Sequence, residues 1–265
     1  MSKTKRGTWH LSCWGALLIT ILLFTGCTTG VIQPKKIVGD QKTREIINVL
    51  REKEPRIENL KGLFRASITG SILPLSRTLP GVVFYNRPDS IRLKGLTPVG
   101  GTFFQFTRSS NNYRLMLPAS GRLTSGSIHE LHQAGDIGKV VDLSLRAMDA
   151  VLGKVKGLES DEVRFYEEDR GFRTDFLESR DRADEVALTR TWVDKQRHDI
   201  VYVEYLNHDG ELLMSIECED FRSISPQDSA FGLTQYLPFR VQAEDTRLSG
   251  SVTLLFQELV LNAGS

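Results

Sequence analysis

Hydrophobic and polar residues alternate along the stretch 60–117, and this alternation predicts strands with one buried face. Every second residue is apolar from Phe64 to Ile68 and again from Ile91 to Leu93, which is the period of a half-buried strand. Short Gly, Pro and Asn connections leave no room for crossover helices, so we expect antiparallel pairing. The strands predicted in this stretch are 60–70, 80–86, 90–96, 101–107 and 112–117.

Two further segments have the apolar spacing of amphipathic helices. Residues 40–54 place aliphatic side chains among charged ones, and Pro55 ends the segment. Residues 136–152 repeat apolar side chains at helical spacing, with Asp136 as the expected N-cap and Gly153 as the stop. The apolar stripe of the second helix is wide, so it needs a sheet or a ligand to pack against.

More strand-like runs follow the second helix, and His208–Gly210 has the composition of a tight hairpin turn. Together the pattern predicts a mainly β protein of roughly eleven strands and two or three helices, built on one strongly bent antiparallel sheet. The runs in this half are 162–167, 171–177, 185–193, 199–206, 211–221, 238–243 and 250–261.

Residues 1–26 have the form of a secretory signal. Basic residues are followed by an apolar run at 11–24, which is shorter than the ~20 residues that a membrane-spanning helix needs. Residues 23–27, Leu-Phe-Thr-Gly-Cys, resemble a bacterial lipobox, and that resemblance implies cleavage before Cys27 and acylation of its thiol and amine, palmitate included. The alternatives are an ordinary cleaved signal or an uncleaved anchor, with Cys27 incidental.

The rest of the chain is expected to consist of a tether and one domain. Residues 27–39 are expected to form the lipidated cysteine and a short polar tether, and 40–265 a single domain. The sorting rule of enteric lipoproteins would place a chain with Thr28 after the lipidated cysteine at the periplasmic face of the outer membrane.

Charge and cysteine content narrow the possible functions. The formal net charge is +1, and no basic cluster rises above background, so nucleic acid is not an expected partner. If Cys13 leaves with the signal and Cys27 carries lipid, Cys218 has no partner for a disulfide. Its acidic neighbours would raise the pKa of the thiol, which favours a buried structural cysteine over a nucleophile.

The pair His129 and His132 has a spacing that can hold zinc on a helix. Without a third strong ligand, two surface histidines are the preferred interpretation, and we predict no metal and no cofactor. No nucleophile-elbow, phosphate-loop or dinucleotide motif is present in the sequence. We therefore do not expect an enzyme.

Several short segments follow one another in a recognisable order along the chain. They are Asn59-Leu60 with Gly62, Leu96 to Gly101, Asn112 to Leu115, Gly121 to Gly126, Leu237-Pro238 and Val252 to Phe256. Their order resembles the family of the outer-membrane lipoprotein receptor LolB and the periplasmic carrier LolA. The resemblance implies an unclosed antiparallel β-barrel, a half-pipe with helices across its mouth, whose apolar interior takes acyl chains.

Two sets of site residues follow. By resemblance, the loop Pro98-Val99-Gly100 is a membrane-insertion loop, with Val99 where the receptor has an exposed Leu. A second apolar loop, Ile72 to Leu75 with Leu79, either touches lipid or folds back onto the barrel end. The residues expected to line the lipid cavity, each with ordinary core packing as the alternative, are Phe64, Phe84, Phe104, Phe106, Leu115 and Met148.

Two functions compete. The first is a monomeric, membrane-tethered module that receives the acyl chains of lipoproteins or another lipid, for example from a LolA-like periplasmic carrier, and inserts them in the outer membrane. The second is a structural or assembly lipoprotein of the outer membrane that grips a protein partner with the same fold, its groove filled by side chains.

Overall fold

The computed structural model divides the chain into two units, residues 1–35 and 36–265. The residues that it describes all belong to the second unit. They are 36–37, 40–53, 56–70, 77–154, 163–169, 171–179, 185–225 and 235–261. The predicted signal, Cys27 and the apolar loop at 72–75 therefore lie outside the described residues.

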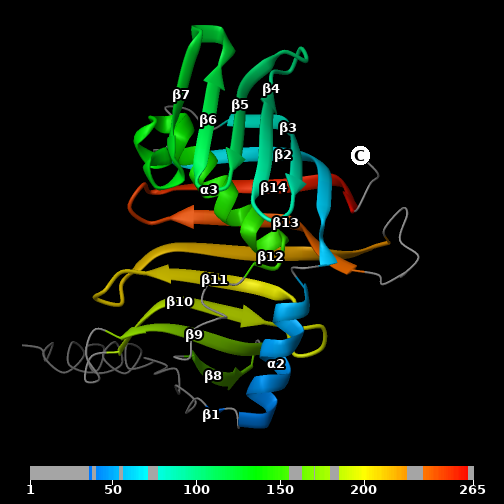
Figure 1. Ribbon diagram of the computed structural model, residues 1–265, viewed down its shortest axis with the longest axis vertical. Helices are drawn as coiled ribbons and strands as arrows, with labels where there is room; N and C mark the ends of the chain where they lie inside the picture. The colour runs from blue at the N-terminus through cyan, green and yellow to red at the C-terminus, as the bar shows by residue number, and fades with distance from the viewer. Residues whose placement is uncertain are drawn as a thin grey trace, which may run out of the picture. The chain divides into compact units, whose positions relative to one another are not determined.

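All described strands of this unit belong to one antiparallel sheet of 14 strands. The sheet does not close, because β1 and β7 form its two ends and do not pair with each other (Figure 1). The spatial order is β1-β8-β9-β10-β11-β12-β13-β14-β2-β3-β4-β5-β6-β7. The strands are β1 (Lys36–Ile37), β2 (Asn59–Gly70), β3 (Arg77–Asn86), β4 (Ser90–Leu96), β5 (Thr102–Ser109), β6 (Asn112–Leu117), β7 (Arg122–Ser127), β8 (Val163–Glu168), β9 (Gly171–Ser179), β10 (Glu185–Val193), β11 (Ile200–Leu206), β12 (Leu212–Ile224), β13 (Gln235–Asp245) and β14 (Gly250–Leu261).

The predicted alternation is confirmed in the strands at the centre of the sheet. In β2, Phe64, Ala66 and Ile68 are buried, and in β4, Ile91 and Leu93 are buried. The second strand of the chain meets the last one, because β14 pairs with β2 along almost its whole length. Their facing apolar side chains form one face of a continuous core.

Both predicted helices are present, and α3 (Asp136–Val151) lies across the inner face of the sheet, against β11 to β14 (Figure 1). Its wide apolar stripe is buried there, including Val141 and Met148, which are both fully buried. The other helix, α2 (Asp40–Lys53), buries Ile46 and Leu50. The helices therefore cover the inner face that an open sheet would otherwise expose.

Local details differ from the sequence expectations in five places, namely the N-cap of α3, two strands and two 3-10 helices. The N-cap of α3 is Gly135, with φ of 87°, and Asp136 is the first helical residue. Gly153 does stop α3, with φ of 72°. Strands β1 and β7 were not predicted, nor were the short 3-10 helices η2 (Pro118–Ser120) and η3 (Ile128–Gln133). The strand count is therefore higher than the roughly eleven expected from the pattern.

Neither α2 nor α3, nor any other helix in the described part of the chain, combines the length and apolar character needed to cross a bilayer.

Candidate functional site

The inner side of the sheet contains a pocket of about 320 Å³ where the C-terminal ends of α2 and α3 meet β11, β12 and β13. This volume lies at the lower end of the range for ligand pockets, roughly 300–1,000 Å³. Its walls are mostly apolar and come from segments far apart in the sequence. They include Val49, Leu50, Ile57, Ala150, Val151, Leu152, Ile200, Phe221, Leu237 and Pro238. We call this the apolar pocket.

One polar wall of the apolar pocket is built by the turn between β10 and β11. The carboxylate of Asp194 accepts hydrogen bonds from the backbone N–H groups of Gln196, Arg197 and Asp199, at 2.8, 2.7 and 3.2 Å. Burial opposes the ionisation of Asp194, but these three donors outweigh it and hold the pKa below its usual range. The turn is thereby fixed, and it presents Arg197 and Asp199 to the pocket.

The cation at this wall is already neutralised. Arg197 Nε donates to Asp199 Oδ2 at 2.7 Å, and its guanidinium lies 5.0 Å from the ring centre of Tyr236 and 5.7 Å from that of Phe221. Asp199 is buried. Because two carboxylates, Asp194 and Asp199, face one guanidinium, the wall offers no excess positive charge to an anion. This wall is therefore charge-balanced, and the rest of the lining is mostly apolar, with Arg56, Gln235 and Tyr236 as its other polar residues.

A second, larger cavity of about 810 Å³ lies between η3, the exposed side of α3 and the turns after β3, β5 and β13. Its walls carry both signs of charge. Lys154 donates to the carbonyl of Pro88 at 2.9 Å and lies 3.4 Å from Asp89. Burial opposes protonation of Lys154, yet Tyr85, Asp149 and Asp89 together raise its pKa. This cavity is polar and does not match an acyl chain.

The predicted cavity residues are placed unevenly. Five of the six are buried in the core, namely Phe64, Phe104, Phe106, Leu115 and Met148, but none of these lines either of the two cavities described above. The sequence missed the residues that do line the apolar pocket, because they are brought together only by tertiary packing.

The sixth, Phe84, was assigned wrongly to the interior. It is 42% exposed, while Val83 and Tyr85 on either side are buried. The run of apolar residues in β3 is continuous, so alternation could not decide which face is inside. The register decides it, because Gly81 of β3 pairs with the inward-facing Phe64 of β2.

The loop predicted to insert in membranes is an exposed hairpin tip between β4 and β5. Gly100 N–H donates to the carbonyl of Thr97 at 2.9 Å, and Gly100 has φ of 85°. Pro98 occupies the second turn position, where its fixed φ is favourable. Val99 is 93% exposed at this tip and is the most exposed of the large apolar side chains in the described residues. The structure thus holds an apolar side chain in solvent at the expected place.

Cys218 is buried, as predicted, and lies on the inner face of β12. Burial is the main cause that raises the pKa of its thiol, and Glu217 and Asp199 add to it. The acidic neighbours were expected to be the cause, but they are the smaller contribution. A thiol that stays protonated is a poor nucleophile.

His129 and His132 lie in η3, at the edge of the polar cavity. Within the described ranges, no group of three or more His, Cys, Asp or Glu side chains is placed to hold a metal ion. The prediction of two surface histidines stands, since both are exposed.

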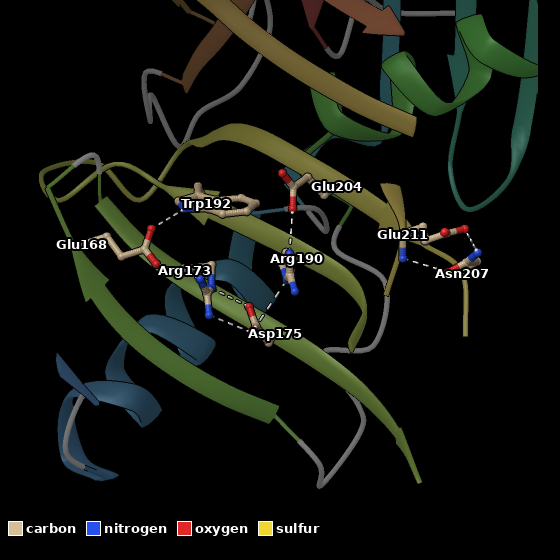
Figure 2. Close-up of polar contacts among 8 residues, drawn as sticks. All are labelled: Glu168, Arg173, Asp175, Arg190, Trp192, Glu204, Asn207 and Glu211. Carbon is tan, nitrogen blue, oxygen red and sulfur yellow. Dashed lines mark hydrogen bonds and ion pairs between the residues drawn. The ribbon is translucent and has the colours of Figure 1, made fainter. Parts of the chain in front are cut away.

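A buried ion-pair network stiffens the other end of the sheet (Figure 2). Arg173 and Asp175 of β9 are each 5% exposed, and Arg173 Nη2 donates to Asp175 Oδ2 at 2.9 Å. Arg173 Nη1 also donates to Glu168 at 2.8 Å, and Trp192 Nε1 donates to the same carboxylate at 2.9 Å. The guanidinium lies 4.3 Å from the ring centre of Tyr166. None of these residues lines either cavity described above.

Comparison with known proteins addresses the fold. No protein-family model matches the chain, and no curated protein matches its sequence. Among solved structures, a domain from Vibrio parahaemolyticus described as an outer membrane lipoprotein-sorting protein superposes with a TM-score of 0.52 and 13% identity, over 84% of this chain and 94% of that one. The chain shares the fold of this domain.

Two further structures resemble it. A DUF1329 family protein from Desulfovibrio piger gives a TM-score of 0.55 at 9% identity, over 84% of this chain and 94% of that chain. A LolA superfamily protein from Nitrosomonas europaea gives 0.48 at 10% identity, over 82% and 94%. The unclosed antiparallel sheet with helices, which the resemblance to the LolA and LolB family implied, is confirmed as a fold by the Vibrio and Desulfovibrio structures.

Proposed function

We propose that the protein is an outer-membrane lipoprotein that binds acyl chains in the apolar pocket, receiving lipoproteins or another lipid and inserting them in the membrane. The observation that carries this proposal is the apolar pocket itself, which lies on the inner face of an unclosed sheet and is lined mostly by apolar residues. A lipid headgroup would meet its polar residues, which are Arg56, Arg197, Asp199, Gln235 and Tyr236. An acyl chain gains roughly 0.8 kcal/mol for each methylene that it buries. Transfer of the acyl chain to the membrane then requires no bond to be made or broken. It requires only that the carrier, the pocket and the membrane bury the chain about equally well.

The proposal includes the anchor and the location predicted from the sequence. Cys27 carries the lipid, 27–39 is the tether, 40–265 is the lipid-binding domain and the periplasmic face of the outer membrane is the site of action. A LolA-like carrier is the donor, and the exposed Val99 tip enters the bilayer during deposition. No part of this scheme requires an enzyme activity, a cofactor or a metal.

We also propose that bound chains extend from the pocket into the core. Leu50 and Ile57 of the pocket wall belong to the same continuous apolar cluster as Phe64 and Met148. A chain could follow this cluster if side chains of α3 rearrange. The residues assigned to this extended path are Phe64, Phe104, Phe106, Leu115 and Met148.

The test uses a chain that begins at Thr28, which lacks the signal and Cys27 but keeps the whole unit 36–265. A fluorescent fatty acid should bind with a saturable signal, and Val49→Glu should weaken binding at least tenfold, because Val49 lines the pocket and is only half-buried. The matched control is Leu255→Glu, at a 39% exposed position on the other face. Equal binding by both variants and the unmodified chain would overturn the pocket assignment.

Chain length tests the extended path separately. If the pocket alone binds lipid, affinity should stop rising once the acyl chain exceeds the pocket. If the path extends into the core, affinity should keep rising by roughly fourfold per methylene, which corresponds to ~0.8 kcal/mol. Competition of unlabelled fatty acids of increasing length against the fluorescent one measures this directly.

A further inference from the structure

The side chains of β2 to β6 that point away from the core form a surface with one sign of charge. The stretch 59–127 contains nine Lys and Arg residues and one acidic residue, Asp89, although the whole chain has 34 basic and 33 acidic residues. The expectation that no basic cluster stands out is therefore wrong. The nine are Lys61, Arg65, Arg77, Arg87, Arg92, Lys94, Arg108, Arg114 and Arg122.

The sheet register gathers five of these cations on the outer face. In one row across the strands, Lys61 pairs with Phe84, Phe84 with Arg92, Arg92 with Thr107 and Thr107 with Arg114. Strands lie about 4.8 Å apart, so this row spans about 19 Å from β2 to β6.

The adjacent row repeats the mixture of cationic and apolar side chains. Leu63 pairs with Val82, Val82 with Lys94, Lys94 with Gln105 and Gln105 with Met116, and Leu123 of β7 continues the row. The two rows and Arg65 define what we call the basic face. Its cations are Lys61, Arg65, Arg92, Lys94 and Arg114, and its exposed large apolar residues are Leu63, Phe84, Met116 and Leu123.

The cations of the basic face are not held in ion pairs among the described residues, and an acidic residue, Glu258 of β14, borders the face opposite Leu63. None of its five cations forms an ion pair with the residues that the structure describes, and Lys61 Nζ lies over the Phe84 ring at 5.8 Å. The acidic residue of this stretch, Asp89, lies in the β3–β4 turn and faces Lys154 at 3.4 Å and Arg108 at 3.8 Å. Four of the five cations are exposed, and Lys94 is half-buried.

The apolar members identify the partner. Leu63 and Met116 are each 38% exposed, Phe84 is 42% and Leu123 is 51%, all among the cations. Nucleic acid would leave Leu63, Met116 and Leu123 without a suitable contact. A bilayer places anionic headgroups directly above an apolar layer, so cations and apolar side chains on one face both find partners.

We propose that the basic face binds the surface of a membrane that contains anionic lipids. Val99 belongs to the hairpin between β4 and β5, two strands of this face, so the exposed tip projects from one end of it. Binding by the basic face would hold the domain flat on the bilayer. This role is independent of the apolar pocket, which lies on the inner face of the sheet.

The experiment measures sedimentation of the chain from Thr28 onward with vesicles. The vesicles contain phosphatidylcholine alone or with roughly a third phosphatidylglycerol. Binding to the anionic vesicles should be stronger, and it should fall as the Debye length shrinks from roughly 10 Å at 0.1 M salt to about 3 Å at 1 M. The triple variant Arg65→Gln, Arg92→Gln, Arg114→Gln should bind on the order of 100-fold more weakly, from three lost charges.

A charge-matched control separates the basic face from net charge. The variant Arg44→Gln, Lys195→Gln, Arg222→Gln loses three exposed cations outside the face and should bind like the unmodified chain. Equal loss in both triple variants would overturn the proposal, as would no loss in either. Retention on single-stranded DNA without a preference for anionic vesicles would also overturn it, and would identify a nucleic-acid surface instead.

Insertion of the apolar side chains of the basic face into the bilayer can be measured separately. A chain from Thr28 contains one native tryptophan, Trp192, on β10. Phe84→Trp should gain fluorescence quenching by brominated lipids on vesicle binding, and the unmodified chain should not. Fatty-acid binding in solution should be unchanged in the triple variant. If the triple variant loses vesicle binding but keeps fatty-acid binding, the basic face is supported. Val49→Glu should instead lose fatty-acid binding and keep vesicle binding, which tests the pocket.

Discussion

Phe64 lies across the backbone of Gly81, its partner on the neighbouring strand. A Cβ atom at position 81 would lie 2.5 Å from Cζ of this ring and 3.0 Å from the carbonyl oxygen of Lys94. The arrangement recurs two strands along, where the ring of Phe104 lies 2.4 Å from a Cβ placed at Gly95. These two glycines let large rings lie flat on the inner face of the sheet.

Gly81→Ala should therefore destabilise the domain by about 1–3 kcal/mol, the usual cost of forcing extra volume into a packed core. Urea unfolding measures it. Phe64→Leu removes the ring, so the double variant Phe64→Leu/Gly81→Ala should lose less stability than the sum of the single changes. Additive losses would show that ring and glycine do not interact.

The exposed hairpin tip gives a functional prediction. Because Val99 is 93% exposed, Val99→Glu should change the free energy of unfolding by less than about 0.5 kcal/mol and leave fatty-acid binding intact. A charge at the tip opposes entry into the bilayer, so transfer of bound fatty acid to vesicles should slow at least tenfold. Stopped-flow fluorescence measures the transfer, with Val99→Leu as the control that keeps an apolar tip. Unchanged transfer by Val99→Glu would remove this role.

The sequence was sufficient to predict a strand where one face of that strand is exposed to solvent and the other is buried. The alternation from Phe64 to Ile68 predicted β2 correctly, because its residues follow a strict period of two. It failed for β7, Arg122–Ser127, whose half-exposed polar residues leave no apolar period to detect. It also failed for Phe84, where a continuous apolar run gives no choice of face.

The sites were less predictable than the strands, for a physical reason. The apolar pocket joins Val49 of α2, Ala150 of α3 and Phe221 of β12, which are far apart along the chain. The basic face likewise depends on register, since a shift of one residue would move Arg92 to the other side of the sheet. Local pattern contains neither relationship.

The ion-pair network of Figure 2 predicts a large effect from a small change. Asp175→Asn removes one of the two carboxylates bonded to the buried Arg173, while Glu168 stays in place, and should cost about 1.5–3 kcal/mol in the free energy of unfolding. Arg173→Met/Asp175→Leu removes both charges and should cost less than Asp175→Asn. Urea unfolding measures both, with Asp209→Asn in the exposed β11–β12 turn as the control. A loss below about 0.5 kcal/mol for Asp175→Asn would contradict a structural role for the network.

Two buried groups predict how stability changes at high pH. Burial raises the pKa of the Cys218 thiol, and it raises the pKa of Tyr205 to about 12, with Asp149 adding to the effect. In the unfolded chain these groups ionise near about 8.5 and 10. The unfolded state therefore releases protons that the folded state keeps, so the free energy of unfolding must fall as pH rises above those values.

The fall should approach about 1.4 kcal/mol per pH unit between roughly pH 8.5 and 10, where the unfolded thiol is the ionising partner. Urea unfolding across this range measures the slope. Cys218→Ala lowers stability at every pH because it removes a buried side chain, but it should also flatten the slope in this window. Tyr205→Phe should keep the slope here and reduce it only above about pH 10. If Cys218→Ala retains the full slope, another group controls the alkaline stability of the domain.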